Sequence, residues 1–272
     1  MATDDTSFSA AYGCWAVISG GSDGLGAAFA EEIAARGVNL VLVARRQGPL
    51  DALAAELEAR HGIKVRTVSL DLAEPAAARR LDESTADLDL GLIVFNAGSD
   101  AGGDFFLDPS YSQWQSLLSR NINFLTEALY LFGRRLRAKQ GGGMIVVGSE
   151  AAFGGGARGA LYTATKGYAL NLAESLWAEL RPDNVDVLTL LFGITDTPTL
   201  RRVLARKGIP IEATGAVPPA QLAVAAIEAL GTGPVLNFDE LPGDESLTSA
   251  NTRRDRVIDV SNKLAGFHAA SD

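Results

Sequence analysis

The sequence predicts an α/β protein: one domain built on a doubly wound parallel sheet, with helices on both faces. Short runs of apolar and β-branched residues alternate with longer Ala/Leu/Glu-rich segments of helical spacing along most of the 272 residues. The apolar runs are continuous, which is typical of strands buried on both faces. Because crossovers between such strands are right-handed, a single doubly wound domain over residues 1–272 is the expected closure.

The elements follow one another in a regular order. Strands are predicted at residues 14–19, 38–44, 63–70, 90–95, 143–148 and 185–192. Helices are predicted between and after them, at about 24–36, 49–61, 75–84, 111–138, 160–181 and 218–230. Three segments that follow strands break the alternation, namely 98–110, 150–159 and 194–219. Because ligands bind outside the carboxyl ends of parallel strands, these segments are expected to wall a site, with 194–219 as a substrate lid.

The composition excludes several classes of function. The net charge is −9, and the basic residues form no strong cluster, so a nucleic-acid partner is not expected. The single cysteine, Cys14, stands in an apolar run and is expected to be buried. Neither His61 nor His268 has neighbours at metal-ligand spacing, so no metal site is predicted. The N-terminus lacks the apolar core of a secretory signal, and no apolar run would span a bilayer, so we expect a cytoplasmic protein.

A glycine-rich stretch joins the first strand to the first helix. Glycines at 20, 24 and 26 allow a tight turn and close approach of a pyrophosphate to the positive end of a helix, although a flexible turn would use the same residues. The second strand ends at Ala44, where an NAD site usually carries an acidic residue, but Arg45 and Arg46 follow. A guanidinium suits a 2′-phosphate, which favours NADP(H) over NAD(H). Two arginines that extend into solvent at a strand end are the alternative.

A tyrosine and a lysine stand one helical turn apart in the stretch GALYTATKGYALNL. Tyr162 and Lys166 therefore leave the same face of a predicted helix, as such pairs do by chance on many helices. A free tyrosine has a pKa near ~10, too high for efficient acid–base catalysis at neutral pH. A cation one turn away favours the phenolate and lowers that pKa, which makes the pair a candidate half of an active site.

With the remaining motifs, the chain resembles a short-chain dehydrogenase/reductase of the roughly 250-residue, tyrosine-dependent branch, over about residues 14–235. SGGSDGLG (19–26) stands for TGxxxGxG, DL (71–72) for the adenine-contacting Asp and NAG (96–98) for NNAG. NIN supplies the helical Asn, taken as Asn123, and YTATK (162–166) is YxxxK, with Ser149 thirteen residues before its tyrosine. Each motif alone is weak, but all of them in this order form a specific signal.

The resemblance implies a Rossmann-like fold and a role for each matching residue. Tyr162 would exchange a proton with the substrate oxygen, Ser149 would hydrogen-bond that oxygen, and Lys166 would tune the tyrosine and hold the nicotinamide ribose. Asn123 would hold a water that relays protons to Lys166. The cofactor-binding set implied is Gly20, Ser22, Asp23, Gly24, Leu25, Gly26, Arg45, Arg46, Asp71, Leu72, Asn96, Ala97, Gly98, Tyr162, Lys166, Gly193, Thr195 and Thr197.

Several positions depart from the family's pattern. Phe95 replaces the first Asn of NNAG, Gly21 takes a usual Ala position, and Phe192 stands where a Pro-Gly pair normally starts. The missing proline bears on Thr197, which would contact the nicotinamide carboxamide. Glu150 adds a charge directly after the expected catalytic serine. The tail, residues 236–272, does not resemble the family's usual ending.

The expected activity is NADP(H)-dependent interconversion of an alcohol and a ketone or aldehyde. Apolar side chains on the expected site walls favour an apolar or aromatic substrate (steroid-like, aryl or fatty-acyl), although several would equally suit a core: Phe105, Phe106, Phe153, Phe192, Leu200 and Val203. One alternative is a sugar-nucleotide epimerase or dehydratase, which uses YxxxK but carries a larger C-terminal domain. Another is a non-catalytic NADP-sensing regulator, although such proteins typically lose the Tyr or the Lys.

An oligomer is also expected. The predicted helix at 160–181 is apolar nearly all round, and a helix of that kind must be covered on both sides. Since only one side can face the sheet, the other side, with the helix at 111–138, would form a homodimer or homotetramer, as in family members.

Overall fold

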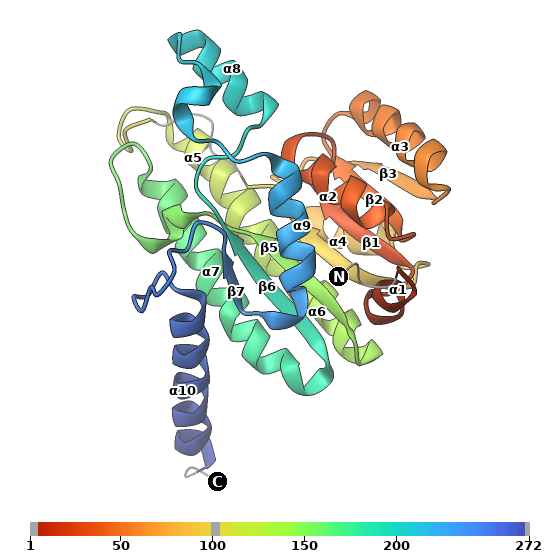
Figure 1. Cartoon of the computed structure of the whole chain (residues 1–272), viewed down its shortest axis with the longest axis vertical. Coiled ribbons are helices and arrows are strands. Elements are labelled where there is room, and N and C mark those ends of the chain that lie inside the picture. The colour runs from red at the N-terminus through yellow and green to blue at the C-terminus, as the bar shows by residue number, and fades with distance from the viewer. Residues whose placement is uncertain (1–4, 99–103, 270–272) are drawn as a thin grey trace.

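A seven-stranded parallel sheet forms the centre of the molecule, with helices on both faces (Figure 1). The computed structural model describes residues 5–98 and 104–269. The strand order β3-β2-β1-β4-β5-β6-β7 runs outward in two directions from the β1/β4 pair, which confirms the predicted doubly wound, Rossmann-like fold. The strands are β1 (Trp15–Ser19), β2 (Asn39–Ala44), β3 (Val65–Ser69), β4 (Leu90–Phe95), β5 (Gly142–Val147), β6 (Val185–Leu191) and β7 (Val235–Asn237).

Helices connect the strands and extend both ends of the chain. Six of the helical segments lie where the sequence predicts them, and a short helix lies inside the expected lid. The predicted helix at 111–138 is divided by a six-residue π-helix, Ser119–Phe124. The helices are α1 (Asp5–Tyr12), α2 (Gly24–Ala34), α3 (Gln47–His61), α4 (Ala77–Ser84), α5 (Tyr111–Leu118), α6 (Leu125–Lys139), α7 (Ala160–Leu180), α8 (Pro198–Lys207), α9 (Pro219–Ala229) and α10 (Ala250–Ala269).

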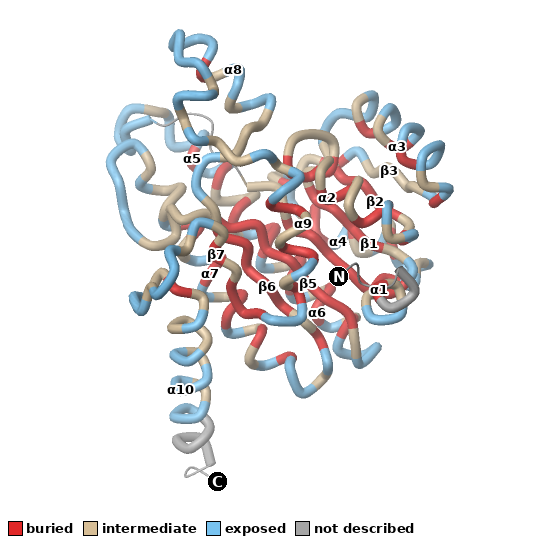
Figure 2. Tube along the Cα trace, viewed as in Figure 1, coloured by how far each residue is buried: buried red, intermediate tan, exposed pale blue. Residues whose placement is uncertain are grey.

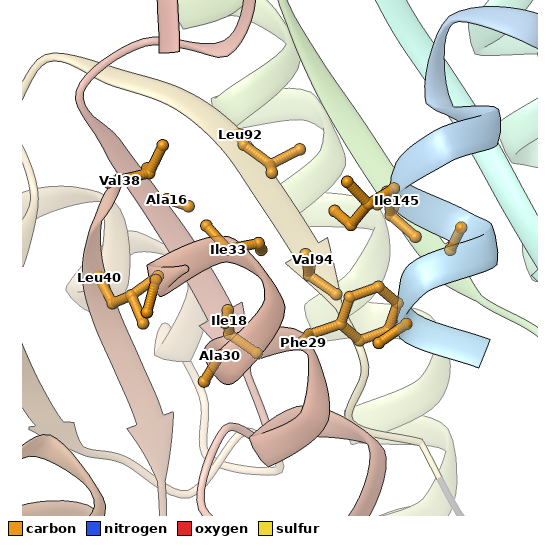
Figure 3. Packing of buried hydrophobic residues seen from close by; sticks show 14 of the residues in the cluster. Ala16, Ile18, Phe29, Ala30, Ile33, Val38, Leu40, Leu92, Val94 and Ile145 are labelled. Atoms are coloured by element: carbon orange, nitrogen blue, oxygen red, sulfur yellow. The ribbon is translucent and has the colours of Figure 1, made fainter. Parts of the chain in front are cut away.

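Successive residues of the central strands enter two different cores, one on each face of the sheet. In β1, Ala16 and Ile18 lie in the core that includes Phe29 and Ile33 of α2 (Figure 3). The residue between them, Val17, lies in the opposite core with side chains of α4, α6 and α7. This alternation follows from the two-residue side-chain period of a strand. The strands β1, β2, β4, β5 and β6 are accordingly buried along most of their length, whereas β3 at the edge of the sheet is half-buried (Figure 2).

Both ends of the chain contain elements that the sequence pattern does not predict. Near the N-terminus, α1 places Phe8 in the core, and the hydroxyl of Tyr12 donates to Asp186 Oδ2 over 2.8 Å. At the other end, β7 pairs with β6, and α10 extends away from the body of the molecule (Figure 1). The expectation that Cys14 is buried is wrong: its side chain is exposed, because it precedes the first residue of β1.

The helix α7 is covered on one side by the sheet and in part on another by the chain's own tail. Glu174 of α7 is buried and forms an ion pair with Arg253 of α10. Tyr168, nearer the start of α7, remains 38 % exposed, with its hydroxyl 2.7 Å from Thr126 Oγ1 of α6. In the part of the chain that the structure describes, no helix is long and apolar enough to cross a membrane.

Candidate active site

The predicted site residues gather at the carboxyl edge of the sheet, where the segments after β1, β4, β5 and β6 meet. Asn96 Nδ2, just after β4, donates to the carbonyl of Gly20, just after β1, over 3.0 Å. After β6, Thr197 lies against the same glycine-rich turn, since its Cγ2 is 3.1 Å from where a Cβ of Gly24 would stand. The structure therefore brings together segments that are far apart in the sequence.

The glycine-rich turn can be built only with glycine at key positions. Gly20 and Gly24 have φ of +74° and +54°, in the left-handed region that favours glycine. A Cβ on Gly26 would stand 2.0 Å from the carbonyl oxygen of Gly20, so no side chain fits there. Asp23 caps α2 by accepting from the Gly24 amide over 2.7 Å. Ser22 is half-buried and Leu25 is buried. The backbone of the turn lies at the N-terminus of α2, which is the positive end of the helix dipole.

Two exposed arginines mark the carboxyl end of β2. Arg45 and Arg46 directly follow Ala44, and within the described ranges neither guanidinium forms a hydrogen bond or an ion pair. Just beyond the end of the neighbouring strand, β3, Asp71 uses one carboxylate oxygen to accept from the Ala73 amide over 3.0 Å, and Leu72 is buried. This edge therefore presents two unpartnered positive charges to solvent.

Ser149 stands two residues beyond the end of β5. Its backbone is extended, with φ of −171°, and it opens a short 3₁₀ turn, Glu150–Phe153. The Ser149 Oγ accepts a hydrogen bond from the Ala151 amide over 3.2 Å. Because a hydroxyl also carries one donor, its proton remains free to be directed to an oxygen atom in the site.

Tyr162 and Lys166 lie in the first two turns of α7, one turn apart, with the Lys166 Nζ 5.7 Å from the centre of the tyrosine ring. Lys166 is buried, and its Nζ donates to the carbonyl of Val147, the last residue of β5, over 2.9 Å. Burial lowers the pKa of this amine to about 8, and the positive charge of Arg120 contributes. The lysine thus connects α7 to the strand that leads to Ser149.

The structure places Asn121, rather than Asn123, beside the lysine, so the expected position of the helical Asn is corrected. Asn121 is buried in the π-helix, and its Nδ2 donates to Thr165 Oγ1 over 3.1 Å and to the Gly98 carbonyl over 3.4 Å. Among the described residues its Oδ1 has no hydrogen-bond partner, and both this atom and Lys166 Nζ are 3.5 Å from where a Cβ of Gly98 would stand.

Asn123 is exposed instead, and it lines a separate surface hollow of about 190 Å³ with residues of the segment before α4. Two positions along a helix place side chains on opposite faces, so both asparagines cannot point to the same site. The buried residues Trp114, Leu117 and Phe124 recur at spacings of three and seven residues, and Asn121 continues this stripe. That periodicity is the signal that identifies Asn121 from the sequence.

The segment after β6 carries three further predicted residues. The Gly193 amide donates to Asp239 Oδ2 over 2.8 Å. Thr195 pairs with Val217 across the base of the lid, and its buried Oγ1 has no hydrogen-bond partner within residues 5–98 and 104–269. Thr197 begins α8, accepting from the Leu200 amide over 3.2 Å. An unpartnered buried hydroxyl at this edge is consistent with a polar ligand held there.

The expected apolar walls divide into two groups. Phe105 and Phe106 are each 47 % exposed; Arg158 lies over the first ring at 4.1 Å, and Trp114 stacks on the second at 5.8 Å. By contrast, Phe192 packs against the main core, so its role is at least partly structural. Residues 99–103, which belong to the first expected wall, lie outside the described residues.

The residues at this edge fit a dinucleotide. The glycine-rich backbone leaves room for close approach, and the arginines are free to meet a phosphate. Two buried polar atoms, Asn121 Oδ1 and Thr195 Oγ1, lack hydrogen-bond partners in the part of the chain that the structure describes. No group of three or more His, Cys, Asp or Glu side chains in the described ranges could hold a metal ion. The arrangement therefore suits a nucleotide cofactor, and it places the Lys166 amine between the ring of Tyr162 and the last residue of β5.

Comparisons with known proteins agree with this arrangement. The short chain dehydrogenase family model matches residues 14–208. A 7beta-hydroxysteroid dehydrogenase of Clostridium sardiniense is 34 % identical over 188 residues, which cover 69 % of this chain and 72 % of that protein. A very-long-chain 3-oxoacyl-CoA reductase of Podospora anserina is 35 % identical over 179 residues, which cover 64 % of this chain and 53 % of that protein.

Solved structures show the same similarity over a greater length. One described for 7beta-hydroxysteroid dehydrogenase stereoselectivity superimposes with a TM-score of 0.81 at 26 % identity, covering 92 % of this chain and 98 % of the other. A short-chain dehydrogenase from Sphingobium yanoikuyae in complex with NADPH gives a TM-score of 0.76 at 28 % identity, covering 93 % and 95 %. The chain therefore belongs to the short-chain dehydrogenase/reductase family and is an oxidoreductase that interconverts hydroxyl and keto groups with a nicotinamide cofactor.

Proposed function

We propose that the protein is an NADP(H)-dependent carbonyl reductase or alcohol dehydrogenase that acts on apolar ketones and secondary alcohols. The observation that carries the proposal is the buried Lys166 amine beside Tyr162, which is hydrogen-bonded to Val147 at the end of the strand that precedes Ser149. Such a group supplies a proton donor, a charge that tunes it and a second hydrogen bond for the same substrate oxygen.

In the reductive direction, Tyr162 donates its proton to the carbonyl oxygen while Ser149 donates a hydrogen bond to the same atom. Negative charge develops on that oxygen in the transition state, and two preorganised donors stabilise it. Lys166 favours the phenolate that remains and would hold the nicotinamide ribose. The bound nicotinamide supplies the hydride. Asn121, with its free Oδ1, would hold a water that returns a proton to Lys166.

The preference for NADP(H) rests on Arg45 and Arg46. A carboxylate would normally bind the ribose 2′-hydroxyl of NAD at the end of this strand, and none follows β2 here. Free guanidinium groups gain charge-assisted hydrogen bonds from a 2′-phosphate. The NADPH bound by the Sphingobium yanoikuyae relative supports the same choice.

The proposed substrate class is based on the apolar side chains of the expected site walls. Leu107 is 88 % exposed beside Phe105 and Phe106, and the lid adds the exposed side chains of Ile194 and Ile209. Apolar surface of this kind is covered by an apolar substrate when one binds. The relatives named for hydroxysteroids and very-long-chain oxoacyl compounds favour a bulky apolar ketone over a small polar one.

The test is oxidation of NADPH, followed at the reduced-nicotinamide absorbance, with NADH in parallel and steroidal, aryl and aliphatic ketones as substrates. The variant Tyr162→Phe should lose activity by roughly 10²–10⁴-fold while still binding NADPH. The double variant Arg45→Ala/Arg46→Ala should raise the KM for NADPH by roughly tenfold or more and leave that for NADH nearly unchanged. Better turnover with NADH in the native protein would refute the assignment of the two arginines.

The rival functions predict different results. A sensor would bind NADPH without turnover of any ketone, and the presence of both Tyr162 and Lys166 argues against it. An epimerase or dehydratase would act on a sugar nucleotide and would turn over none of the apolar ketones. The cytoplasmic location and the homodimer or homotetramer remain predictions. Sedimentation velocity tests the predicted oligomer, and the exposed face of α7 that carries Tyr168 is the expected contact between subunits.

A further inference from the structure

A carboxylate from the tail is bonded to the backbone of the proposed cofactor-binding segment. β6 and β7 pair in parallel with Leu191 opposite Asn237, and the ladder continues through a hydrogen bond from the Phe238 amide to the Leu191 carbonyl over 2.9 Å. Gly193 and Asp239 each stand two residues beyond that pair, and the Gly193 amide donates to Asp239 Oδ2 over 2.8 Å. A hydrogen bond from an amide to an ionised carboxylate is stronger than a neutral one.

We propose that Asp239 is a positioning residue, which fixes the segment from Gly193 to Thr197 so that it can hold the nicotinamide end of the cofactor. The proposal rests on the proposed function, because that function assigns this segment to the cofactor. Gly193 is exposed and has no side chain, and Phe192 before it replaces a residue type, proline, that would restrict the backbone. The hydrogen bond to Asp239 supplies a restraint that the local sequence lacks.

The tail is itself fixed, so Asp239 is a rigid anchor. Asn237 Nδ2 donates to the Thr248 carbonyl over 3.1 Å, and the Ala250 amide at the start of α10 donates to Glu240 Oε2 over 2.9 Å. Both interactions hold the segment between β7 and α10 in one conformation. Asp239 therefore lies between two residues, Asn237 and Glu240, whose side chains are hydrogen-bonded, and not on a free loop.

The first turn of α10 is then bonded to the helix that carries Tyr162 and Lys166. Arg253 Nε and Nη2 donate to the two carboxylate oxygens of Glu174 over 2.5 and 2.9 Å, and the side chains are 11 % and 7 % exposed. The same guanidinium lies 5.8 Å from the ring of Phe153, in the turn after Ser149. A two-point Arg–carboxylate pair with this burial resists displacement. The tail thus connects the segment after β6 to α7.

A second carboxylate, that of Glu150, lies near Asp239. The charge of Asp239 and its hydrogen bond to the Gly193 amide can therefore be tested separately. Glu150 Oε2 and Asp239 Oδ2 are 3.4 and 3.3 Å from the point where a Cβ of Gly193 would stand. Burial, and next the negative charge of Asp239, raise the pKa of Glu150. Asparagine at 239 keeps an acceptor for the Gly193 amide but removes the charge, whereas alanine removes both.

The experiment compares Asp239→Ala, Asp239→Asn and Asp259→Ala in the full chain. Asp259 is the matched control, because its exposed carboxylate in the same tail pairs with Lys263 one turn along α10. Three quantities are measured: the Kd for NADPH from its fluorescence, the KM and kcat for a ketone substrate, and hydrogen exchange of the peptide that contains residues 193–197.

Asp239→Ala should weaken NADPH binding by roughly tenfold, lower kcat and speed exchange in that peptide, while the KM for the ketone changes less. Asp239→Asn should restore each value to within about threefold, and Asp259→Ala should match the native protein. Equal damage in the Ala and Asn variants, or none in either, would overturn the proposal. If the native protein binds no NADPH, the proposed function fails, while hydrogen exchange still decides whether Asp239 fixes the segment. If Asp239→Ala does not fold, Asp239→Asn still tests the proposal. Native hydrogen exchange in the peptide of residues 193–197 together with lost NADPH binding would then overturn the proposal.

Discussion

Replacement of Asn121 and Asn123 by alanine, one at a time, separates a buried polar residue of the site from an exposed neighbour. Asn121 makes two neutral hydrogen bonds, to Thr165 Oγ1 at 3.1 Å and to the Gly98 carbonyl at 3.4 Å. A neutral hydrogen bond contributes about 1 kcal/mol net, and the longer one contributes less. Asn121→Ala should therefore lower the free energy of unfolding by about 1–2 kcal/mol. Asn123→Ala should change it by no more than about 0.5 kcal/mol, because that side chain is exposed.

The two variants should differ more in catalysis than in stability. Asn121 Oδ1 is buried without a partner and near Lys166 Nζ, so its loss removes the group that would hold a proton-relaying water. We expect Asn121→Ala to lower kcat by roughly tenfold or more, and Asn123→Ala to leave it unchanged. Urea unfolding gives the first quantity and steady-state NADPH oxidation the second, both at the same pH and ionic strength.

The result that refutes this reasoning is a reversal of the two positions. If Asn123→Ala lost activity and Asn121→Ala kept it, the functional residue would be the exposed one. The π-helix would then have another purpose, although such helices are often found at functional sites. Loss of activity in both variants with equal loss of stability would also contradict the assignment, because only one of the two side chains is buried.

Two more predictions concern the glycine-rich turn and the buried lysine. Gly26→Ala should destabilise the fold by about 1–3 kcal/mol and weaken NADPH binding, since its Cβ would stand 2.0 Å from the Gly20 oxygen. Gly48→Ala, with nothing within 4 Å, should be neutral or stabilising, and equal effects would contradict the steric argument. Burial lowers the Lys166 pKa from 10.5 to about 8, so the unfolded chain binds more protons between these values. Stability relative to Lys166→Met should therefore rise by up to about 3 kcal/mol as pH increases through that window, and a pH-independent difference would contradict this.

The central strands and most helices could be predicted because each is specified by its own residues. The six predicted strands agree with the observed ones within about two residues at each end, since buried parallel strands are continuous apolar runs. The interruption at Ser119–Phe124 could not be predicted in the same way. A π-helix widens one turn of a helix without any change in composition, so propensity does not distinguish it.

The elements that bind the ends of the chain depend on distant partners. β7 has three residues, too few for a pattern of alternation or a continuous run, and its existence depends on pairing with β6. α10 is held through Arg253, whose partner Glu174 stands 79 residues earlier. The N-terminal helix α1 is held in a similar way by Tyr12 and Asp186. Ion pairs and hydrogen bonds between such distant positions have no local sequence signal.

The same distinction explains why the type of reaction could be predicted from the sequence and the substrate could not. Tyr162 and Lys166 share a helix, and residues that follow neighbouring parallel strands meet at one edge, so topology alone brings the reacting groups together. The walls are different, because each depends on contacts that a loop residue makes with another segment. Phe106 is placed by Trp114, and Phe105 by Arg158 from the loop after β5. Substitution of these loop contacts should therefore alter which ketone is accepted before it alters the transfer of hydride.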